Sequence, residues 1–204
     1  MLSRPLLPLL CASIVALAPS STLQAQTAPA RPLSSESGLY LSAAAYSAGT
    51  LEHPIDCRTR EHVIDRHTFL GKPYVDVIHE GKNYRHNKSD IFGYRDCKGH
   101  DVRFFEKVEY EVAEAGPIVI YTSERTVPYG KGVKRVTEYS FSQTPASPVI
   151  ALTKAHLARE YPEAHQFHHL IDMNTPGDVA LAAYDSAAKT FKVNALYRQF
   201  QQGR

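Results

Sequence analysis

One stretch of this sequence organises the fold: DIFGYRDCKGHDVRFF, residues 90–105. Polar and apolar residues alternate on both sides of Lys98-Gly99-His100, a tripeptide that favours a tight turn. The pattern predicts two antiparallel strands joined by that turn. Their apolar positions are Phe92, Tyr94, Val102 and Phe104.

Further short strands are expected on both sides of this hairpin, over residues 55–152. Lys107–Val112 and Val133–Ser142 alternate in polarity, Tyr74–His79 is a further candidate strand, and Ile118–Tyr121 is an apolar run typical of a central strand. Turns separate these segments at short intervals, as in antiparallel meanders. The region therefore predicts an antiparallel sheet of about six to eight strands that is curled or partly closed into an open β-barrel.

The last quarter of the chain, residues 153–202, changes to a helical period. The segment from Asp178 to the end is predicted to be helical throughout, after two shorter helices. An amphipathic stripe of i, i+3, i+4 and i+7 positions indicates a helix packed on an apolar surface. That stripe consists of Val193, Leu196, Tyr197 and Phe200.

These two regions together predict a single α+β domain over residues 37–204. Its C-terminal helices are expected to pack on the open face of the sheet, which needs an apolar cover. The sequence shows no internal repeat and no sign of a second domain.

Residues 1–25 have the features of an export signal. Arg4 precedes an apolar run from Leu6 to Ala18, and Ala25 is a small residue suited to cleavage. The run is too short for a spanning helix with flanking anchors. Two alternatives stay open: an anchor that is never removed, and a lipoprotein acylated at Cys11.

Residues 26–36 are rich in proline, alanine and serine, and predict a disordered leader after the signal. We expect the mature chain to be periplasmic or extracellular. We expect no transmembrane segment in it, since no second long apolar run follows.

Cleavage would remove Cys11 and leave Cys57 and Cys97 as the cysteines of the mature chain. An even pair of cysteines in an exported protein predicts a disulfide. The alternative is two free, buried thiols. With both cysteines paired, no thiol would remain as a nucleophile.

The net charge of +2 is nearly balanced, so the chain lacks the strong positive field that nucleic-acid binding requires. No nucleic-acid partner is expected. The sequence leaves two kinds of partner open: a component of the cell envelope and a small ligand.

The clearest metal-binding pattern is His165-Gln166-Phe167-His168-His169. On a helix, His165 and His169 would lie at i and i+4 and could reach one cation, with a third ligand from His156 or Glu160. The alternative is a cluster of surface histidines. Six others are scattered through the β region, where alternating strands mostly point them apart: His53, His62, His67, His79, His86 and His100.

Other catalytic patterns are weak. No Gly-x-Ser-x-Gly nucleophile elbow is present. Glu109 and Glu111 are expected to face solvent, and a hydrolase built on two carboxylates would need only their proximity in space. Gly130-Lys131-Gly132 lacks the spacing and the helix of a phosphate-binding loop, and fits a hairpin loop instead.

Tyr94, Arg95 and Arg103 are the candidate residues for a ligand surface. Basic and tyrosine side chains alternate in this part of the chain, which suits a polyanion or a glycan. The alternative is a solvated sheet face where arginine stems cover aromatic rings, with Arg95, Asp96 and Arg103 pairing among themselves.

Three segments resemble a group of small exported proteins of unassigned function from environmental Gram-negative bacteria. They are Lys88–Phe105, the Gly-Lys-Gly loop before Val133, and Phe191–Tyr197. The resemblance implies an exported location and no catalytic residues. The sequence thus predicts an exported, non-enzymatic binding or envelope-associated module that requires no cofactor. The alternative is a small periplasmic hydrolase or a histidine-based metal-binding protein.

Overall fold

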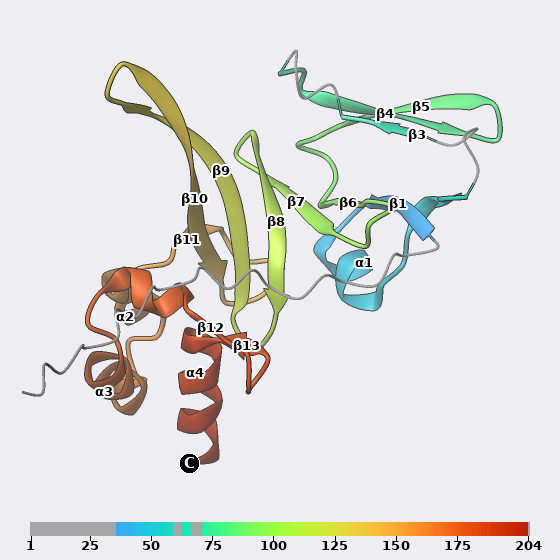
Figure 1. Cartoon of the computed structure of the whole chain (residues 1–204). Helices are drawn as coiled ribbons and strands as arrows, with labels where there is room; N and C mark the ends of the chain where they lie inside the picture. The colour runs from blue at the N-terminus through green and yellow to red at the C-terminus, as the bar shows by residue number, and fades with distance from the viewer. Residues whose placement is uncertain (1–35, 59–62, 67–70, 204) are drawn as a thin grey trace, which may run out of the picture.

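The computed structural model describes residues 36–58, 63–66 and 71–203. It has the predicted α+β architecture: a large antiparallel sheet, a smaller sheet beside its N-terminal strands, and helices at the C-terminus (Figure 1). Several predictions fall on residues outside the described ranges. These residues are the predicted signal (1–25) with Cys11, the leader up to residue 35, His62 and His67. Glu36, assigned to the leader, is the first residue of strand β1.

The main sheet has eight strands among the described residues, in the order β11-β10-β9-β8-β7-β6-β1-β2. In chain order these strands are β1 (Glu36–Tyr40), β2 (Glu52–Asp56), β6 (Gly93–Arg95), β7 (Asp101–Phe105), β8 (Val108–Ala115), β9 (Val119–Tyr129), β10 (Gly132–Ser142) and β11 (Ile150–Ala151). The small sheet contains β3 (Val63–Asp65), β4 (Tyr74–His79) and β5 (Lys82–Asn87).

The remaining elements are mostly helical. They are α1 (Ala43–Ala48), α2 (Lys154–Glu160), α3 (His165–Asn174), the 3-10 helix η2 (Asp178–Ala182), the short strands β12 (Tyr184–Asp185) and β13 (Thr190–Phe191), and α4 (Lys192–Gln202). Within the part of the chain that the structure describes, no helix is long and apolar enough to cross a membrane.

The hairpin over residues 90–105 is confirmed. Strands β6 and β7 pair in antiparallel fashion, with Tyr94 opposite Val102. In the turn, the Asp96 carboxylate accepts the backbone N–H of Lys98 and of His100, each at 2.8 Å. Gly99 has a φ of 79°, a left-handed conformation that glycine adopts without strain.

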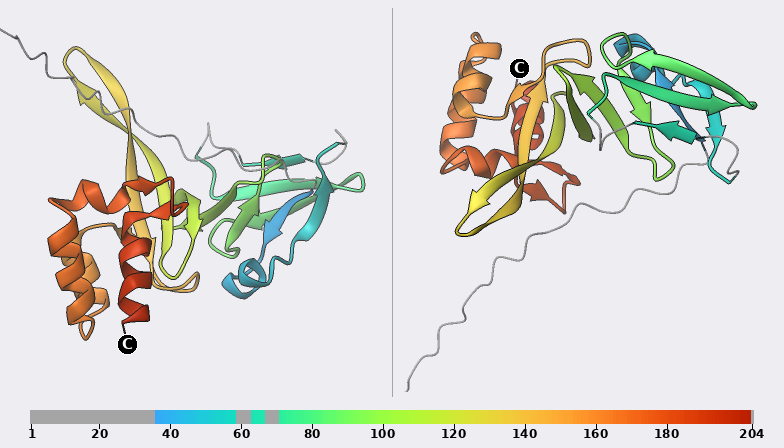
Figure 2. Two further views of the ribbon diagram at one scale, coloured as in Figure 1. Left: turned by 60° about the horizontal axis from the view of Figure 1, so that its bottom comes forward. Right: turned by 90° about the horizontal axis from the view of Figure 1, so that it is seen from above.

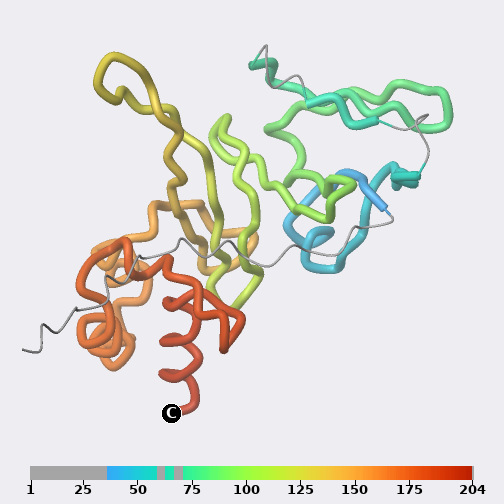
Figure 3. Tube along the Cα trace, viewed as in Figure 1, coloured from blue at the N-terminus to red at the C-terminus, as the bar shows by residue number. Residues whose placement is uncertain are grey.

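The prediction of a curled or partly closed barrel was wrong. The main sheet is open, and β2 and β11 are its edges. The reason is that the chain leaves the sheet after β2, forms β3, β4 and β5 as a separate sheet, and returns at β6 (Figure 3). The strands that could have continued a meander thus form a second layer instead.

The small sheet covers one end of one face of the main sheet. Leu39, Tyr94 and Val102 are in register across β1, β6 and β7, so their side chains share this face. They pack against Val75 and Val77 of β4 in a common apolar core. We call this side of the main sheet the cleft face.

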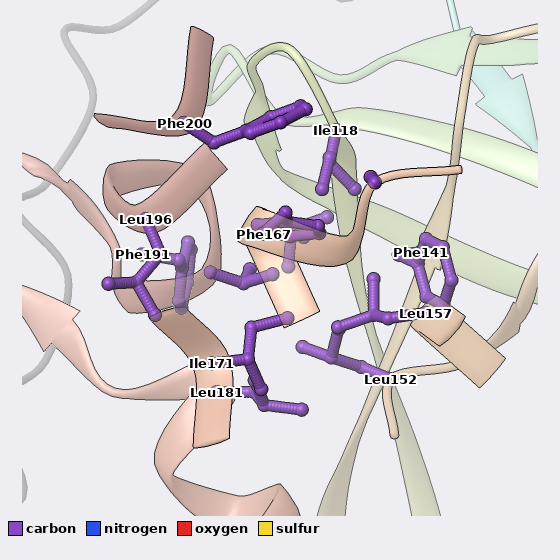
Figure 4. Packing of buried hydrophobic residues seen from close by; sticks show 13 residues of the cluster. Ile118, Phe141, Leu152, Leu157, Phe167, Ile171, Leu181, Phe191, Leu196 and Phe200 are labelled. Atoms are coloured by element: carbon purple, nitrogen blue, oxygen red, sulfur yellow. The ribbon is translucent and has the colours of Figure 1, made fainter. Parts of the chain in front are cut away.

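The C-terminal helices cover the other end of the cleft face. Ile120 and Phe141, opposite each other on β9 and β10, pack into the largest core with residues of α2, α3 and α4 (Figure 4). In α4 the predicted stripe is confirmed: Val193, Leu196 and Phe200 are buried, and Tyr197 packs at the edge of the core.

The prediction of one helix from Asp178 to the end was wrong. Only η2 and α4 are helical, and the β12–β13 hairpin separates them. The Asp185 carboxylate accepts the backbone N–H groups of Ala187 and Ala188, and Lys189 has a φ of 51°. An aspartate turn followed by a left-handed residue interrupts a helix.

Two polar side chains fix α4 to the main sheet. Asn194 is fully buried, and its amide bonds the backbone of Ile118 twice, accepting at 3.0 Å and donating at 2.9 Å. Glu114 accepts hydrogen bonds from the Phe191 backbone N–H at 2.8 Å and from Arg198 at 3.0 Å. A carboxylate at a helix N-terminus satisfies free N–H groups and complements the helix dipole.

Candidate functional site

An open cleft of about 1630 Å³ lies on the cleft face between the small sheet and the β9–β10 hairpin. Its floor begins with Tyr94 and Phe104, which continue the apolar core under the small sheet. Across the strands the floor becomes polar, because Glu111 of β8 stands in register between Val102 and Thr122. The floor of the cleft is therefore aromatic at one end and charged at the other.

Glu109 is the acidic side chain of an ion cluster in the cleft. Its carboxylate contacts Lys88 Nζ at 3.0 Å and Arg66 Nη1 at 3.6 Å. Lys88 is only 15% exposed and lies 5.4 Å from the centre of the Phe104 ring. The expectation that Glu109 faces solvent was wrong, because the small sheet brings two cations over it.

Tyr94 is held against this ion cluster. Arg66 donates a hydrogen bond to the Tyr94 hydroxyl, and its guanidinium lies 5.5 Å from the ring centre. Burial, together with the Glu109 carboxylate, raises the pKa of Tyr94 to about 12 against the opposing effect of Arg66. The hydroxyl therefore stays protonated at physiological pH, and Tyr94 serves as a hydrogen-bonding aromatic wall.

Five charged side chains of the cleft lining make no hydrogen bond or ion pair with the residues that the structure describes, and two of them, Glu106 and Lys107, come from the β7–β8 turn. Glu111 lies on the floor, Arg135 comes from β10, and Lys72 comes from the segment before β4 and lies 5.5 Å from the Tyr74 ring centre. Acidic and basic side chains in one cleft present both signs of charge to a ligand. This volume exceeds the roughly 300–1,000 Å³ of common small-molecule pockets, so the cleft suits an extended ligand.

Only Tyr94 of the three predicted ligand-surface residues lines the cleft. Arg95 lies on the opposite face of the sheet and makes a two-point ion pair with Asp101, at 2.7 and 3.0 Å. The Tyr40 hydroxyl donates to the same carboxylate. Arg95 thus pairs with a neighbouring strand, not with Asp96 or Arg103.

Arg103 lies in the interior of that opposite face and is 5% exposed. Its guanidinium lies 5.2 Å from the ring centres of Phe92 and Phe105, and donates to the Tyr121 hydroxyl and the Ser147 carbonyl. This arginine fastens the loop before β11 onto the sheet.

The predicted disulfide between Cys57 and Cys97 is present, with 5.4 Å between the Cα atoms. It joins the end of β2 to the β6–β7 turn. The bridge therefore closes the excursion of the chain that builds the small sheet, one wall of the cleft. A disulfide is typical of an oxidising compartment.

His165 and His169 both lie on α3 and are exposed. The ring of His165 contacts that of His168, with 6.2 Å between the centres. Over the described ranges, no group of three or more histidine, cysteine or acidic side chains is arranged to hold a metal ion. Metal binding by this histidine pair stays a prediction.

Three of the scattered histidines converge where β2 meets the small sheet, and none of them lines the cleft. The His53 ring stacks on Tyr84 at 4.0 Å, and the ring centres of His79 and His86 are each 5.6 Å from it. The buried Nε2 atom of His86 finds no hydrogen-bond partner within the described structure. We call His53, His79 and His86 the histidine cluster.

Acidification is expected to destabilise the protein through this cluster. Burial lowers the pKa of His53, and the neighbouring His86 and His79 add to the effect, while Glu52, 4.0 Å away, opposes it. Between the lowered pKa and the ordinary value near 6.5, the unfolded chain binds more protons than the folded one. The free energy of unfolding therefore rises with pH through that interval, and this contribution is lost as pH falls through the folded-state pKa.

Denaturant unfolding at several pH values between about 5 and 8 measures this slope. His53→Asn should flatten it, since asparagine does not titrate and tolerates the φ of 48° at this position. The exposed His165→Asn serves as the matched control. Equal slopes in the His53 variant and the wild type would contradict the assignment.

Sequence reasoning missed most of this cleft. Arg66, Lys72 and Arg135 come from separate segments, and no local pattern joins them. One signal for the histidine cluster was present: His79 and His86 lie near opposite ends of the β4–β5 hairpin, on the same face as Tyr84. The position of His53 depends on packing between the two sheets.

No family model, curated protein or solved structure matches this chain in the three comparisons made with known proteins.

Proposed function

We propose that this protein is an exported binding module that holds an extended ligand of mixed charge, such as a peptide segment, in the cleft beside the small sheet. The observation that carries the proposal is the set of charged groups in the cleft that the described structure leaves without ion-pair partners: Lys72, Glu106, Lys107, Glu111 and Arg135. Such groups can exchange water for ligand contacts without first breaking an ion pair.

Export is supported by three features of the chain. The predicted signal over residues 1–25, the Cys57–Cys97 bridge and the resemblance to small exported proteins all agree with an oxidising compartment outside the cytoplasm. The aromatic end of the cleft, formed by Tyr94 and Phe104, would add apolar contact to the charged end.

Titration with synthetic peptides tests this function in the mature protein. A peptide of alternating glutamate and lysine should shift the NMR amide signals of β8 and β10, and an uncharged serine-glycine peptide should not. Glu111→Gln should weaken binding roughly tenfold, because a charge-assisted contact is lost. Glu163→Gln, an exposed glutamate between α2 and α3, is the control. Identical affinities for both variants would rule the cleft out.

A hydrolase is the second candidate, and one observation favours it. Glu109 and Glu111 alternate on β8 and both line the cleft, and paired carboxylates about 5–10 Å apart catalyse glycoside hydrolysis. Against this, Glu109 is engaged by two cations. Turnover of nitrophenyl glycosides that disappears in Glu111→Gln would establish the hydrolase in place of the binding module.

A further inference from the structure

The β9–β10 hairpin extends well beyond the rest of the main sheet. Its strands pair continuously from Val119 opposite Ser142 to Tyr129 opposite Gly132. The tip projects away from both the small sheet and the helices in Figure 1 and in the left view of Figure 2. Only two strands form this arm, so its end is open to solvent on both sides.

The tip has a single sign of charge. Between Glu124 and Glu138 the sequence contains no acidic residue. At the base of the arm, Glu138 pairs with Arg125 at 2.6 Å and Glu124 accepts a hydrogen bond from Thr137 at 2.7 Å. The residues beyond contribute Lys131, Lys134 and Arg135, three cations without ion pairs among the described residues.

Two large apolar side chains stand at the same tip. Tyr129 is 67% exposed and Val133 is 71% exposed. By the register of the hairpin they lie on opposite faces: Tyr129 with Lys134, whose Nζ lies 4.9 Å from the tyrosine ring centre, and Val133 with Arg135. Each face of the tip therefore combines one apolar side chain with one cation.

We propose that the tip of the β9–β10 hairpin docks on an anionic lipid bilayer. Tyr129 and Val133 enter the headgroup region, while Lys131 and Lys134 contact the anionic headgroups. Aromatic and aliphatic side chains beside lysines are the combination that anchors peripheral proteins at the membrane interface. This proposal gives the exported protein a membrane partner, and it does not depend on ligand binding in the cleft.

The distribution of the charges favours a planar surface over a linear polyanion. A polyanion that ran along the arm would need its cations on one face. Here Lys134 and Arg135 are on opposite faces and Lys131 is in the turn, so positive potential surrounds the end of the arm. Because cations lie on both faces and in the turn, the end of the arm is best suited to contact a flat anionic surface head-on.

The absence of tryptophan from the chain allows a direct test. Tyr129→Trp places a single fluorescent reporter at the tip, and Val179→Trp, at a position 92% exposed in η2, is the matched control. On phosphatidylcholine vesicles that contain phosphatidylglycerol, the emission of the tip reporter should shift to the blue. The control should not shift, and neither protein should shift on pure phosphatidylcholine.

Sedimentation with the same vesicles measures how much the lysine charges contribute to membrane binding. Lys131→Gln/Lys134→Gln should lower the partition coefficient roughly tenfold or more, and added salt should weaken wild-type binding. An unshifted tip reporter, or equal partitioning of this variant and the wild type, would overturn the proposal. So would a blue shift with soluble heparin alone, which would identify a polyanion site. Peptide binding in the cleft is measured separately, so failure of either function is distinguishable from failure of the other.

Discussion

Gly93→Ala is expected to prevent stable folding, or to lower the free energy of unfolding by roughly 3 kcal/mol or more. A Cβ atom at this position would stand 1.8 Å from the Val102 carbonyl oxygen and 2.9 Å from the Arg103 Cα. Both are backbone atoms of the paired strand β7, so no side-chain rotation relieves the clash. Relief requires separation of β6 from β7, which breaks the hairpin that joins the two ends of the main sheet.

Thermal unfolding of Gly93→Ala against Gly177→Ala measures this effect. Gly177 has an extended backbone with a φ of −172°, and a Cβ atom there meets nothing within 4 Å. Both substitutions have the same effect on the unfolded chain, so the difference between them reports the clash alone. A Gly93→Ala protein that melts within a degree or so of the control would refute the close approach.

Removal of the disulfide is expected to have the second large effect. Cys57 and Cys97 are 40 positions apart, and closing a loop of that length stabilises a protein by roughly 4 kcal/mol through the restricted unfolded chain. For a domain of this size, Cys57→Ala/Cys97→Ala should lower the melting temperature by roughly 10 °C. Because the bridge closes the excursion that builds the small sheet, we expect amide exchange to rise first in β3, β4 and β5.

Two further measurements constrain this prediction. Alkylation of mature protein without reductant should add no mass, and two modified cysteines would contradict the bridge. Reduction of the wild type should reproduce the melting temperature of the double variant, since both lack the same cross-link. Identical melting of the variant and the oxidised wild type would show that the bridge contributes no stability.

Local patterns predicted most individual elements. Residues 90–105 form the expected hairpin because alternation and a glycine turn act within a few residues. The stripe of α4 predicted its buried face for the same reason. The wrong prediction of one helix from Asp178 to the end also has a local cause. The Asp185 carboxylate and the left-handed backbone of Lys189 form a turn there, and the spacing of apolar residues carries no information about such a turn.

The candidate site was far less predictable. Tyr94 was identified as a ligand-surface residue, and it does line the cleft. Arg95 and Arg103 were identified with it because they are close in sequence, yet the pleat of β6 and β7 turns them to the other face. Glu109 was expected in solvent, since no local pattern reveals that Lys88 and Arg66 come to lie over it.

The sequence by itself determined the α+β class, the hairpin at residues 90–105, the amphipathic α4 and the pairing of the two cysteines, because each depends on short periods or on simple counting. The tertiary structure alone decided that β3, β4 and β5 leave the main sheet. That single event opens the sheet, creates the cleft around Glu109 and Glu111, and brings His53 to His79 and His86. Its physical cause is the burial of Val75 and Val77 against Leu39 and Tyr94, an apolar contact between segments that no local pattern connects.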